Sequence, residues 1–98
     1  MDTTHFLYLA APPRSTFVFD ATAEEYNILH QHFAFMDDVR NRGKLLLTGP
    51  CLDGFGGVAI FKVTDEAEAA ALMASDPAIQ AGLFTGTLHP MSVDQVTP

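Results

Sequence analysis

The chain has 98 residues, of which 48% are hydrophobic and 17% are charged, and five Lys and Arg stand against twelve Asp and Glu. The resulting net charge of −7 argues against binding to nucleic acid or to anionic lipid surfaces. The length fits one domain, residues 1–98, and this much apolar surface in so short a chain predicts an oligomer.

Cysteine content and the amino-terminal segment bear on cellular location. A single cysteine, Cys51, allows no intramolecular disulfide, and nothing indicates an oxidising compartment. Residues 1–5 lack the basic region of a signal peptide, and no apolar run approaches the roughly 20 residues of a transmembrane helix. We therefore expect a cytoplasmic protein that does not contact a membrane.

The first half of the chain predicts a strand and a long helix. Residues 5–11 are a nearly continuous apolar run closed by two prolines, which indicates a strand, and residues 14–20 are expected to form a loop. Thr22 and Glu25 form a capping box at the start of the helix, and Gly43 ends it. Its apolar stripe is expected to contain Tyr26, Ile28, Leu29, Phe33, Phe35, Met36 and Val39.

The second half predicts a hairpin, a helix and a final strand. Residues 44–48 read as a strand closed by Gly49 and Pro50, and a glycine-rich turn leads into the strand of residues 58–63. Asp65 caps an alanine-rich helix that runs to about Ala74. A turn opens at residues 76–77, and residues 82–93 form the last strand, with Pro90 near its edge or end.

The predicted order is strand, helix, strand, strand, helix, strand. This order is typical of the α+β, ferredoxin-like fold, in which both helices cover one face of a four-stranded antiparallel sheet. The other face would remain uncovered, so we expect a two-fold homodimer with a sandwich or barrel between the subunits. Larger rings built from such dimers are equally compatible with the sequence.

His32 is the first candidate for acid–base chemistry. It lies one turn after Ile28 and one turn before Met36, at the border of the apolar stripe. A histidine sheltered in this way can have its proton affinity set by a neighbour. The alternative is a packed histidine satisfied by one hydrogen bond, which is the more common outcome for this spacing.

Asp76 is the second candidate, and it also has two interpretations. An aspartate immediately before a proline, here Pro77, is ordinary chemistry at the start of a helix. The functional alternative is that its carboxylate accepts the Nδ1 proton of a histidine, so that Nε2 can act as a base. Capping is the stronger explanation from sequence alone.

The remaining reactive side chains show no ligand or nucleophile pattern. His30 points about 200° away from His32 around the helix, which argues against a metal shared by the two. His5 and His89 stand alone, and Cys51 has no nearby positive charge to stabilise a thiolate. The glycine-rich turn is not followed by the Lys-Ser/Thr pair of a phosphate-binding loop.

Several motifs together resemble the YciI-like (YCII-related) family over nearly the whole chain. They are His32 followed by Gly43, the run Lys44-Leu-Leu-Leu-Thr-Gly49-Pro50, the turn Asp53-Gly54-Phe-Gly56-Gly57, and Asp76-Pro77 followed by Ala81-Gly82. The resemblance implies a dimeric α/β-barrel protein with a ferredoxin-like protomer. It also implies a His–Asp pair at the active site, and this pair falls on His32 and Asp76.

The family precedents imply a reaction class. They are the dehydrochlorination of a chlorinated hydroxyquinol and, in related barrels, muconolactone isomerisation, so we expect a lyase or isomerase acting on a small cyclic or aromatic substrate. We expect no cofactor and no metal, and a pocket lined by Tyr8, Arg14, Gly49 and Pro50. The stretch from Pro12 to Ala21 is longer than the family pattern and would change the rim of this pocket. The alternative function is a non-catalytic dimer that binds a small ligand or serves as an accessory protein.

Overall fold

The computed structural model describes residues 4–98. Residues 1–3 belong to the segment interpreted above as lacking a signal peptide and to the predicted domain 1–98, and they lie outside the described residues. Eight elements follow in chain order: β1 (His5–Ala11), α1 (Phe17–Asp20), α2 (Ala23–Asn41), β2 (Leu45–Pro50), β3 (Gly57–Lys62), α3 (Glu66–Ser75), α4 (Pro77–Gln80) and β4 (Thr85–Met91).

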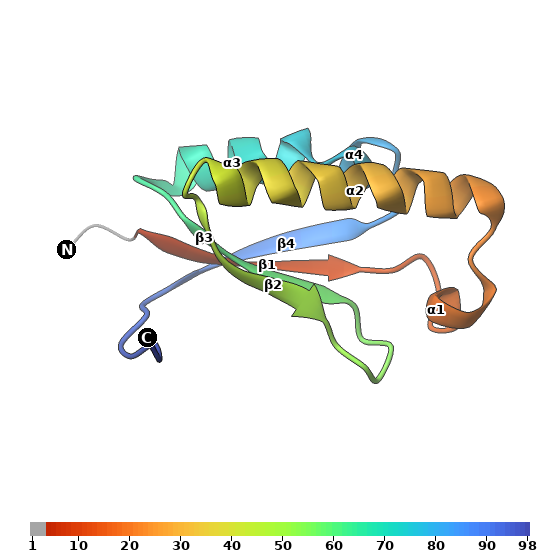
Figure 1. Cartoon of the computed structure of the whole chain (residues 1–98), viewed down its shortest axis with the longest axis horizontal. Coiled ribbons are helices and arrows are strands. Elements are labelled where there is room, and N and C mark those ends of the chain that lie inside the picture. The colour runs from red at the N-terminus through yellow and green to blue at the C-terminus, as the bar shows by residue number, and fades with distance from the viewer. Residues whose placement is uncertain (1–3) are drawn as a thin grey trace.

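The four strands form one antiparallel sheet in the order β2-β3-β1-β4. The helices α2, α3 and α4 lie together on one face of this sheet (Figure 1). The order and the one-sided helix layer confirm the predicted ferredoxin-like arrangement. Because β1 pairs with both β3 and β4, its side chains lie at the centre of the molecule.

The alternation of side chains along β1 decides what lies under the helices. Phe6, Tyr8 and Ala10 are buried on the helix-covered face, while the residues between them are only partly buried. In a strand, successive side chains point to opposite faces, so this pattern fixes which face becomes the core. The main core cluster comprises Phe6, Tyr8, Ala10, Met36, Val39, Ala59, Phe61, Val63, Ala69 and Leu72.

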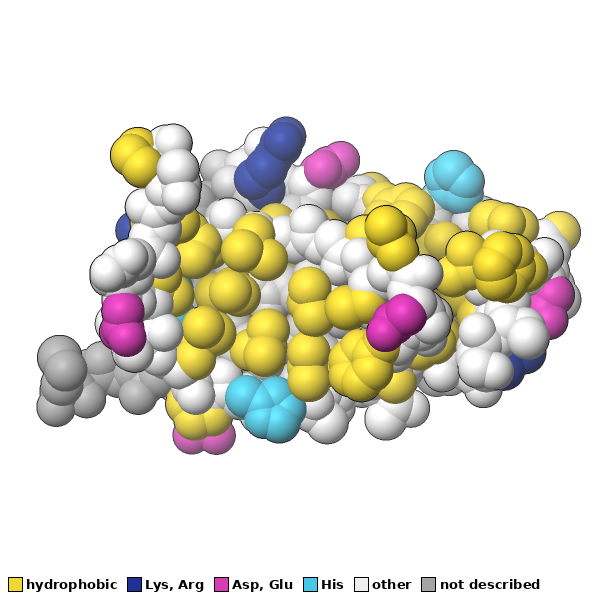
Figure 2. Space-filling model, turned by 90° about the horizontal axis from the view of Figure 1, so that it is seen from below, with side chains coloured by type: hydrophobic (Ala, Val, Ile, Leu, Met, Phe, Trp, Pro, Cys, Tyr) yellow, Lys and Arg dark blue, Asp and Glu magenta, His cyan; other side chains and the backbone are white. Residues whose placement is uncertain are grey.

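The opposite face of the sheet carries a second set of apolar side chains. Leu7 on β1 pairs with Ile60 on β3, which in turn pairs with Leu47 on β2, and Leu9 pairs with Val58. Viewed from below, Figure 2 shows hydrophobic side chains spread across this face. We call the set Leu7, Leu9, Leu47, Val58 and Ile60 the open-face patch; its extent exceeds the scattered apolar residues of an ordinary surface.

The buried side of α2 differs in part from the predicted stripe. Met36 and Val39 are buried, but Tyr26 and Phe33 are 47% and 53% exposed. His32 is only partly exposed and therefore belongs to the side that faces the sheet. The helix begins as predicted, because Thr22 and Glu25 form both hydrogen bonds of the capping box.

The expectation of a loop across residues 14–20 is wrong in part. Residues 17–20 form the single helical turn α1, in which the amide of Phe19 donates to the carbonyl of Thr16. Phe17 is buried in a second cluster with Ala78 and Leu83. One turn is too short to show helical spacing in a sequence, and its stability comes from this tertiary packing.

The carboxy-terminal half follows the prediction with small changes of boundary. Asp65 caps α3, and its carboxylate accepts from the amide of Glu68. Residues 77–80 form the short helix α4 where a turn was expected, and the last strand covers only residues 85–91 of the predicted 82–93. Pro90 lies near the end of β4, which is an edge strand, as expected.

The turn before β3 requires a glycine. Gly56 has φ +142°, and a Cβ there would lie 2.3 Å from the carbonyl oxygen of Ala10, so only glycine fits at this turn.

Within residues 4–98, the helices are too short or too polar to span a lipid bilayer.

Candidate functional site

Asp76 lies where α3 ends and α4 begins. As the N-cap of α4 it accepts a hydrogen bond at Oδ1 from the amide of Ala78, at 2.9 Å, and Pro77 occupies the first helical position. Asp76 is nevertheless completely buried, with 0% of its surface exposed. A helix cap at a surface needs no such burial, so the position of this carboxylate calls for further partners.

His32 supplies one of these partners from the facing helix α2. Its Nδ1 atom lies 2.9 Å from Oδ1 and 2.7 Å from Oδ2 of Asp76. The ring of Phe84 meets the imidazole edge to face, with centroids 5.2 Å apart. The side chain of His32 is 13% exposed, so the ring is sheltered but not sealed.

Tyr8 supplies the third partner from the central strand β1. Its hydroxyl donates to Oδ2 of Asp76 at 2.8 Å, and its ring packs on Phe61 with centroids 5.5 Å apart. Burial is the main reason why the pKa of Tyr8 is raised well above its usual value, and the hydrogen bond to Asp76 raises it further. Tyr8 is therefore a neutral donor at any physiological pH.

The protonation of Asp76 follows from its partners. Burial alone would raise the pKa of Asp76, but hydrogen bonds from His32, the Ala78 amide and Tyr8 outweigh it and hold the pKa below its usual value. The carboxylate is ionised and can only accept, so we assign the ring proton of neutral His32 to Nδ1. Nε2 is then the ring nitrogen left to accept a proton.

A cavity of about 450 Å³ lies beside the imidazole, between α2 and the sheet. Its walls are mostly apolar and come from β1, α1, α2, the β2–β3 hairpin and the residue before β4. The lining residues are Tyr8, Ala10, Pro12, Phe17, Val18, Leu29, His32, Phe33, Met36, Asp37, Thr48, Gly49, Pro50, Cys51, Gly54, Gly56, Gly57, Val58, Ala59 and Phe84. This size accommodates a single aromatic ring with its substituents.

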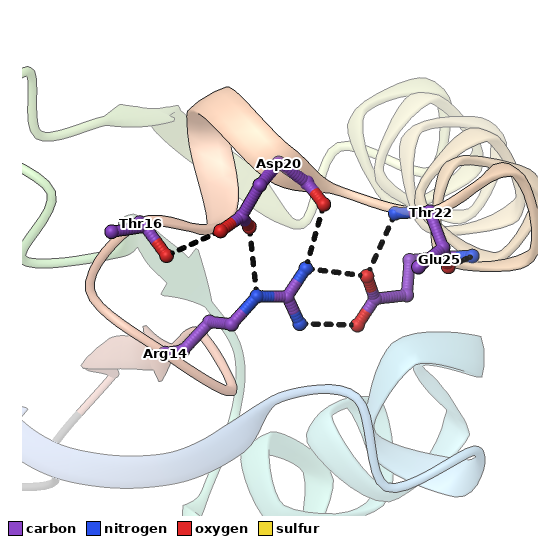
Figure 3. Close-up of polar contacts among 5 residues, drawn as sticks. All are labelled: Arg14, Thr16, Asp20, Thr22 and Glu25. Carbon is purple, nitrogen blue, oxygen red and sulfur yellow. Dashed lines mark hydrogen bonds and ion pairs between the residues drawn. The ribbon is translucent and has the colours of Figure 1, made fainter.

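Three of the four residues expected to line the pocket do so: Tyr8, Gly49 and Pro50. Arg14 does not, because its guanidinium is held elsewhere. Figure 3 shows it between two carboxylates, with Nε donating to Asp20 and both terminal nitrogens donating to Glu25. Arg14 thus joins α1 to the start of α2, and the pKa of Glu25 is lowered to about 2, mainly by its bond to Arg14.

Several cavity residues were not anticipated from the sequence. Phe17 and Val18 come from the segment expected to be a loop. Phe33 belongs to the predicted stripe but is 53% exposed, and Asp37 is an exposed residue of α2 outside that stripe. Cys51, for which the sequence indicated no nucleophilic role, lines the cavity and is only partly buried. The three large apolar residues between Arg14 and Asp20 were the available signal, although only Phe17 among them is buried, whereas Val18 and Phe19 are 64% and 90% exposed.

The other histidines take no part in the site. His30 is exposed on α2, and His5 and His89 form hydrogen bonds with the neighbouring Thr4 and Thr87. Among residues 4–98, no three His, Cys, Asp or Glu side chains converge to hold a metal ion.

Comparison with known proteins relates this arrangement to a family. A search of curated proteins gives no match. Among solved structures, the chain is similar to 5-chloro-2-hydroxyhydroquinone dehydrochlorinase (TftG) from Burkholderia phenoliruptrix AC1100, determined in complex with 2,5-dihydroxybenzoquinone. The TM-score is 0.69 at 18% identity, over 90% of this chain and 93% of that one, which shows a shared fold. The model of the YCII-related domain matches residues 6–88, and the chain therefore belongs to the YCII-related family.

Proposed function

We propose that this protein is an enzyme of the lyase or isomerase type that moves a proton on a small cyclic or aromatic substrate. His32 acts as the base, and Asp76 orients its ring. The observation that carries the proposal is the contact of 2.7 Å between His32 Nδ1 and a fully buried carboxylate, beside a cavity that the imidazole lines.

The geometry supports a simple sequence of proton transfers. Nε2 of His32 accepts a proton from a phenolic hydroxyl or an acidic carbon of the bound substrate, and Asp76 stabilises the imidazolium that forms. The same nitrogen returns the proton to another atom, which completes an isomerisation, or the electrons left on the substrate expel a leaving group, which completes an elimination. Such a base typically contributes about 10²–10⁴-fold to a rate, and no step requires a cofactor.

The walls of the cavity support an aromatic substrate. Phe17, Phe33 and Phe84 line it, and Asp37 and Thr48 are its polar residues apart from Tyr8 and His32. Aromatic walls with few polar groups suit a flat ring that carries hydroxyl or oxo substituents. The fold shared with a dehydrochlorinase of a hydroxyhydroquinone supports this substrate class. Tyr8, Gly49 and Pro50 are the proposed substrate-binding residues because they line the cavity, whereas Arg14 is held in its ion pairs with Asp20 and Glu25.

The test uses two probes of the proposed class. Chloride release from 5-chloro-2-hydroxyhydroquinone reports elimination, and incorporation of deuterium from D₂O into 2-hydroxyhydroquinone, followed by NMR, reports proton transfer. We expect the protein to accelerate at least one of them and His32→Gln to lose the acceleration. His30→Gln is the matched control, since His30 is exposed on the same helix. A folded His32→Gln variant with undiminished rates would refute the role of His32.

A second candidate is a non-catalytic protein that holds a small ligand in the same cavity. The observation in its favour is that Asp76 also caps α4, so its burial has a structural use. If Asp76→Asn keeps ligand affinity and lowers only the stability of the fold, this candidate gains over the enzyme.

We further propose that two copies pair through the open-face patch, as a homodimer that works in the cytoplasm. The patch lies on the sheet face opposite the helices, and a second copy of the sheet is the simplest cover for it. The single cysteine of the chain allows no intramolecular disulfide, so nothing in the sequence requires an oxidising compartment. Sedimentation measures the state of association, and larger assemblies would appear in the same experiment.

A further inference from the structure

Tyr8 has a role that its place in the cavity wall does not explain. We propose that Tyr8 is a positioning residue, whose hydroxyl holds the carboxylate of Asp76 in the orientation that His32 requires. The inference rests on the proposed function, since it assigns a supporting residue to the same His–Asp pair. Tyr8 itself is 1% exposed, so its hydroxyl serves the carboxylate and not the solvent.

The hydrogen bonds of Asp76 show how the orientation is fixed. Oδ1 accepts from the backbone amide of Ala78, and Oδ2 accepts from the hydroxyl of Tyr8. His32 Nδ1 lies within 2.9 Å of both oxygens. With only the amide in place, the carboxylate could rotate about its Cβ–Cγ bond and turn Oδ2 away from the imidazole. The tyrosine on the opposite oxygen prevents this rotation.

Packing around the ring of Tyr8 holds its hydroxyl in a fixed position. Tyr8 lies in the central strand of the sheet, and its ring is packed against Phe61. Gly86 on β4 also lies close to the ring, because an added Cβ there would lie 3.0 Å from Cε1 of Tyr8, 2.8 Å from Sδ of Met73 and 2.9 Å from Cδ1 of Ile79. The absence of a side chain at Gly86 therefore leaves the space in which the ring reaches Asp76.

Sharing of Oδ2 gives Tyr8 an effect that a purely structural residue would lack. The hydroxyl of Tyr8 and the Nδ1 proton of His32 both draw electron density from the same oxygen. Removing the hydroxyl strengthens the remaining bond to His32 and loosens the carboxylate, whereas a stronger donor at position 8 weakens that bond. Burial keeps Tyr8 protonated, so the hydroxyl is a constant donor across the working pH range.

The experiment observes the Nδ1 proton of His32 directly and needs no substrate. This proton, assigned by its loss in His32→Gln, should give a far-downfield NMR resonance protected from solvent. In Tyr8→Phe we expect it to move further downfield or to broaden. Tyr26→Phe is the matched control, because it deletes the same hydroxyl from a tyrosine that is 47% exposed, and it should leave the resonance unchanged.

A second variant covers the case in which Tyr8→Phe does not fold. Incorporation of 3-fluorotyrosine in a Tyr26→Phe background places one fluorinated ring at position 8, which keeps the shape and makes the hydroxyl a stronger donor. We expect the His32 resonance to move upfield, opposite to the shift in Tyr8→Phe. A resonance that stays at its original position in the folded Tyr8 variants would overturn the proposal, and so would equal shifts in Tyr26→Phe.

Activity gives an independent readout on the same variants. If the protein turns over either probe, Tyr8→Phe should lower the rate by about 10-fold, the equivalent of one lost hydrogen bond. If the protein turns over neither probe, the proposed function fails while the resonance experiment still decides the role of Tyr8. The two failures are thus distinguishable.

Discussion

Nδ1 of His32 and Oδ2 of Asp76 lie 2.7 Å apart, although 44 residues separate them in the chain. The contact joins the middle of α2 to the junction of α3 and α4, and all three helices lie on the same face of the sheet (Figure 1). A carboxylate that is 0% exposed must be paired to remain ionised, and His32, Tyr8 and the Ala78 amide provide that pairing. The contact therefore couples the stability of the fold to the chemistry proposed for the cavity.

The first prediction concerns the charge of Asp76. In Asp76→Asn the amide carbonyl can still cap α4, but the amide nitrogen is a donor and cannot accept the Nδ1 proton of His32. We expect the rate on a turned-over probe to fall by about 10²–10⁴-fold. Stability should fall by about 1–3 kcal/mol, since a buried network loses its acceptor. Urea denaturation and the deuterium-incorporation assay measure the two effects.

Asp65→Asn is the control for this substitution. Asp65 caps α3 through the same kind of hydrogen bond and has no histidine partner. The side-chain carbonyl of the introduced amide can still accept from the backbone amide of Glu68, so Asp65→Asn should keep the cap and all of the activity. Equal losses of activity in the two variants would assign the effect of Asp76→Asn to the fold and not to the pair.

The second prediction concerns acid stability. The pKa of Asp76 is lower in the folded protein than its ordinary value of 3.8, so the folded state favours the ionised carboxylate. This contribution is fully present above the unfolded pKa and is lost as the pH falls through the lowered folded pKa. The difference in stability between the wild type and Asp76→Asn should therefore shrink below about pH 4. Denaturant titrations at pH 5, 4, 3 and 2 measure it, and a difference that grows with acid would contradict the assigned pKa direction.

The third prediction concerns the ion pairs of Arg14. Arg14→Ala removes the bonds that join Asp20 at the end of α1 to Glu25 in α2, so we expect faster amide hydrogen exchange in residues 17–20 and a small loss of stability. The effect should weaken in high salt. Arg42→Ala is the control, because it removes an ion pair of Asp38 near the other end of α2. Unchanged exchange in α1 after Arg14→Ala would mean that packing of Phe17 alone holds the turn.

The fourth prediction concerns the open-face patch. Leu9→Lys places a charge within the patch, so pairing of two copies should weaken and sedimentation should show monomer at concentrations where the wild type is dimeric. Leu52→Lys is the control, since Leu52 is 97% exposed in the β2–β3 loop, away from the strands. A wild type that is monomeric at all concentrations, or a Leu9→Lys dimer as tight as the wild type, would contradict pairing through this face.

Local sequence features determined the elements of this protein and, through their order, its fold. The capping box of Thr22 and Glu25, the cap at Asp65 and the paired prolines after β1 each act on neighbours only a few residues away. Such interactions can be read directly from the sequence. The order of strands and helices then leaves few ways to arrange one sheet with helices on one face.

The tertiary structure alone decided which residues meet at the cavity. The sequence offered His32 and Asp76 with a structural alternative for each, and the approach of α2 to the α3–α4 junction brought them together. The hydrogen bond from Tyr8 to the same carboxylate could not be predicted from the sequence either. The same is true of the ion pairs that hold Arg14 away from the cavity. These contacts depend on how whole helices pack on the sheet, because that packing brings together side chains that no local pattern relates.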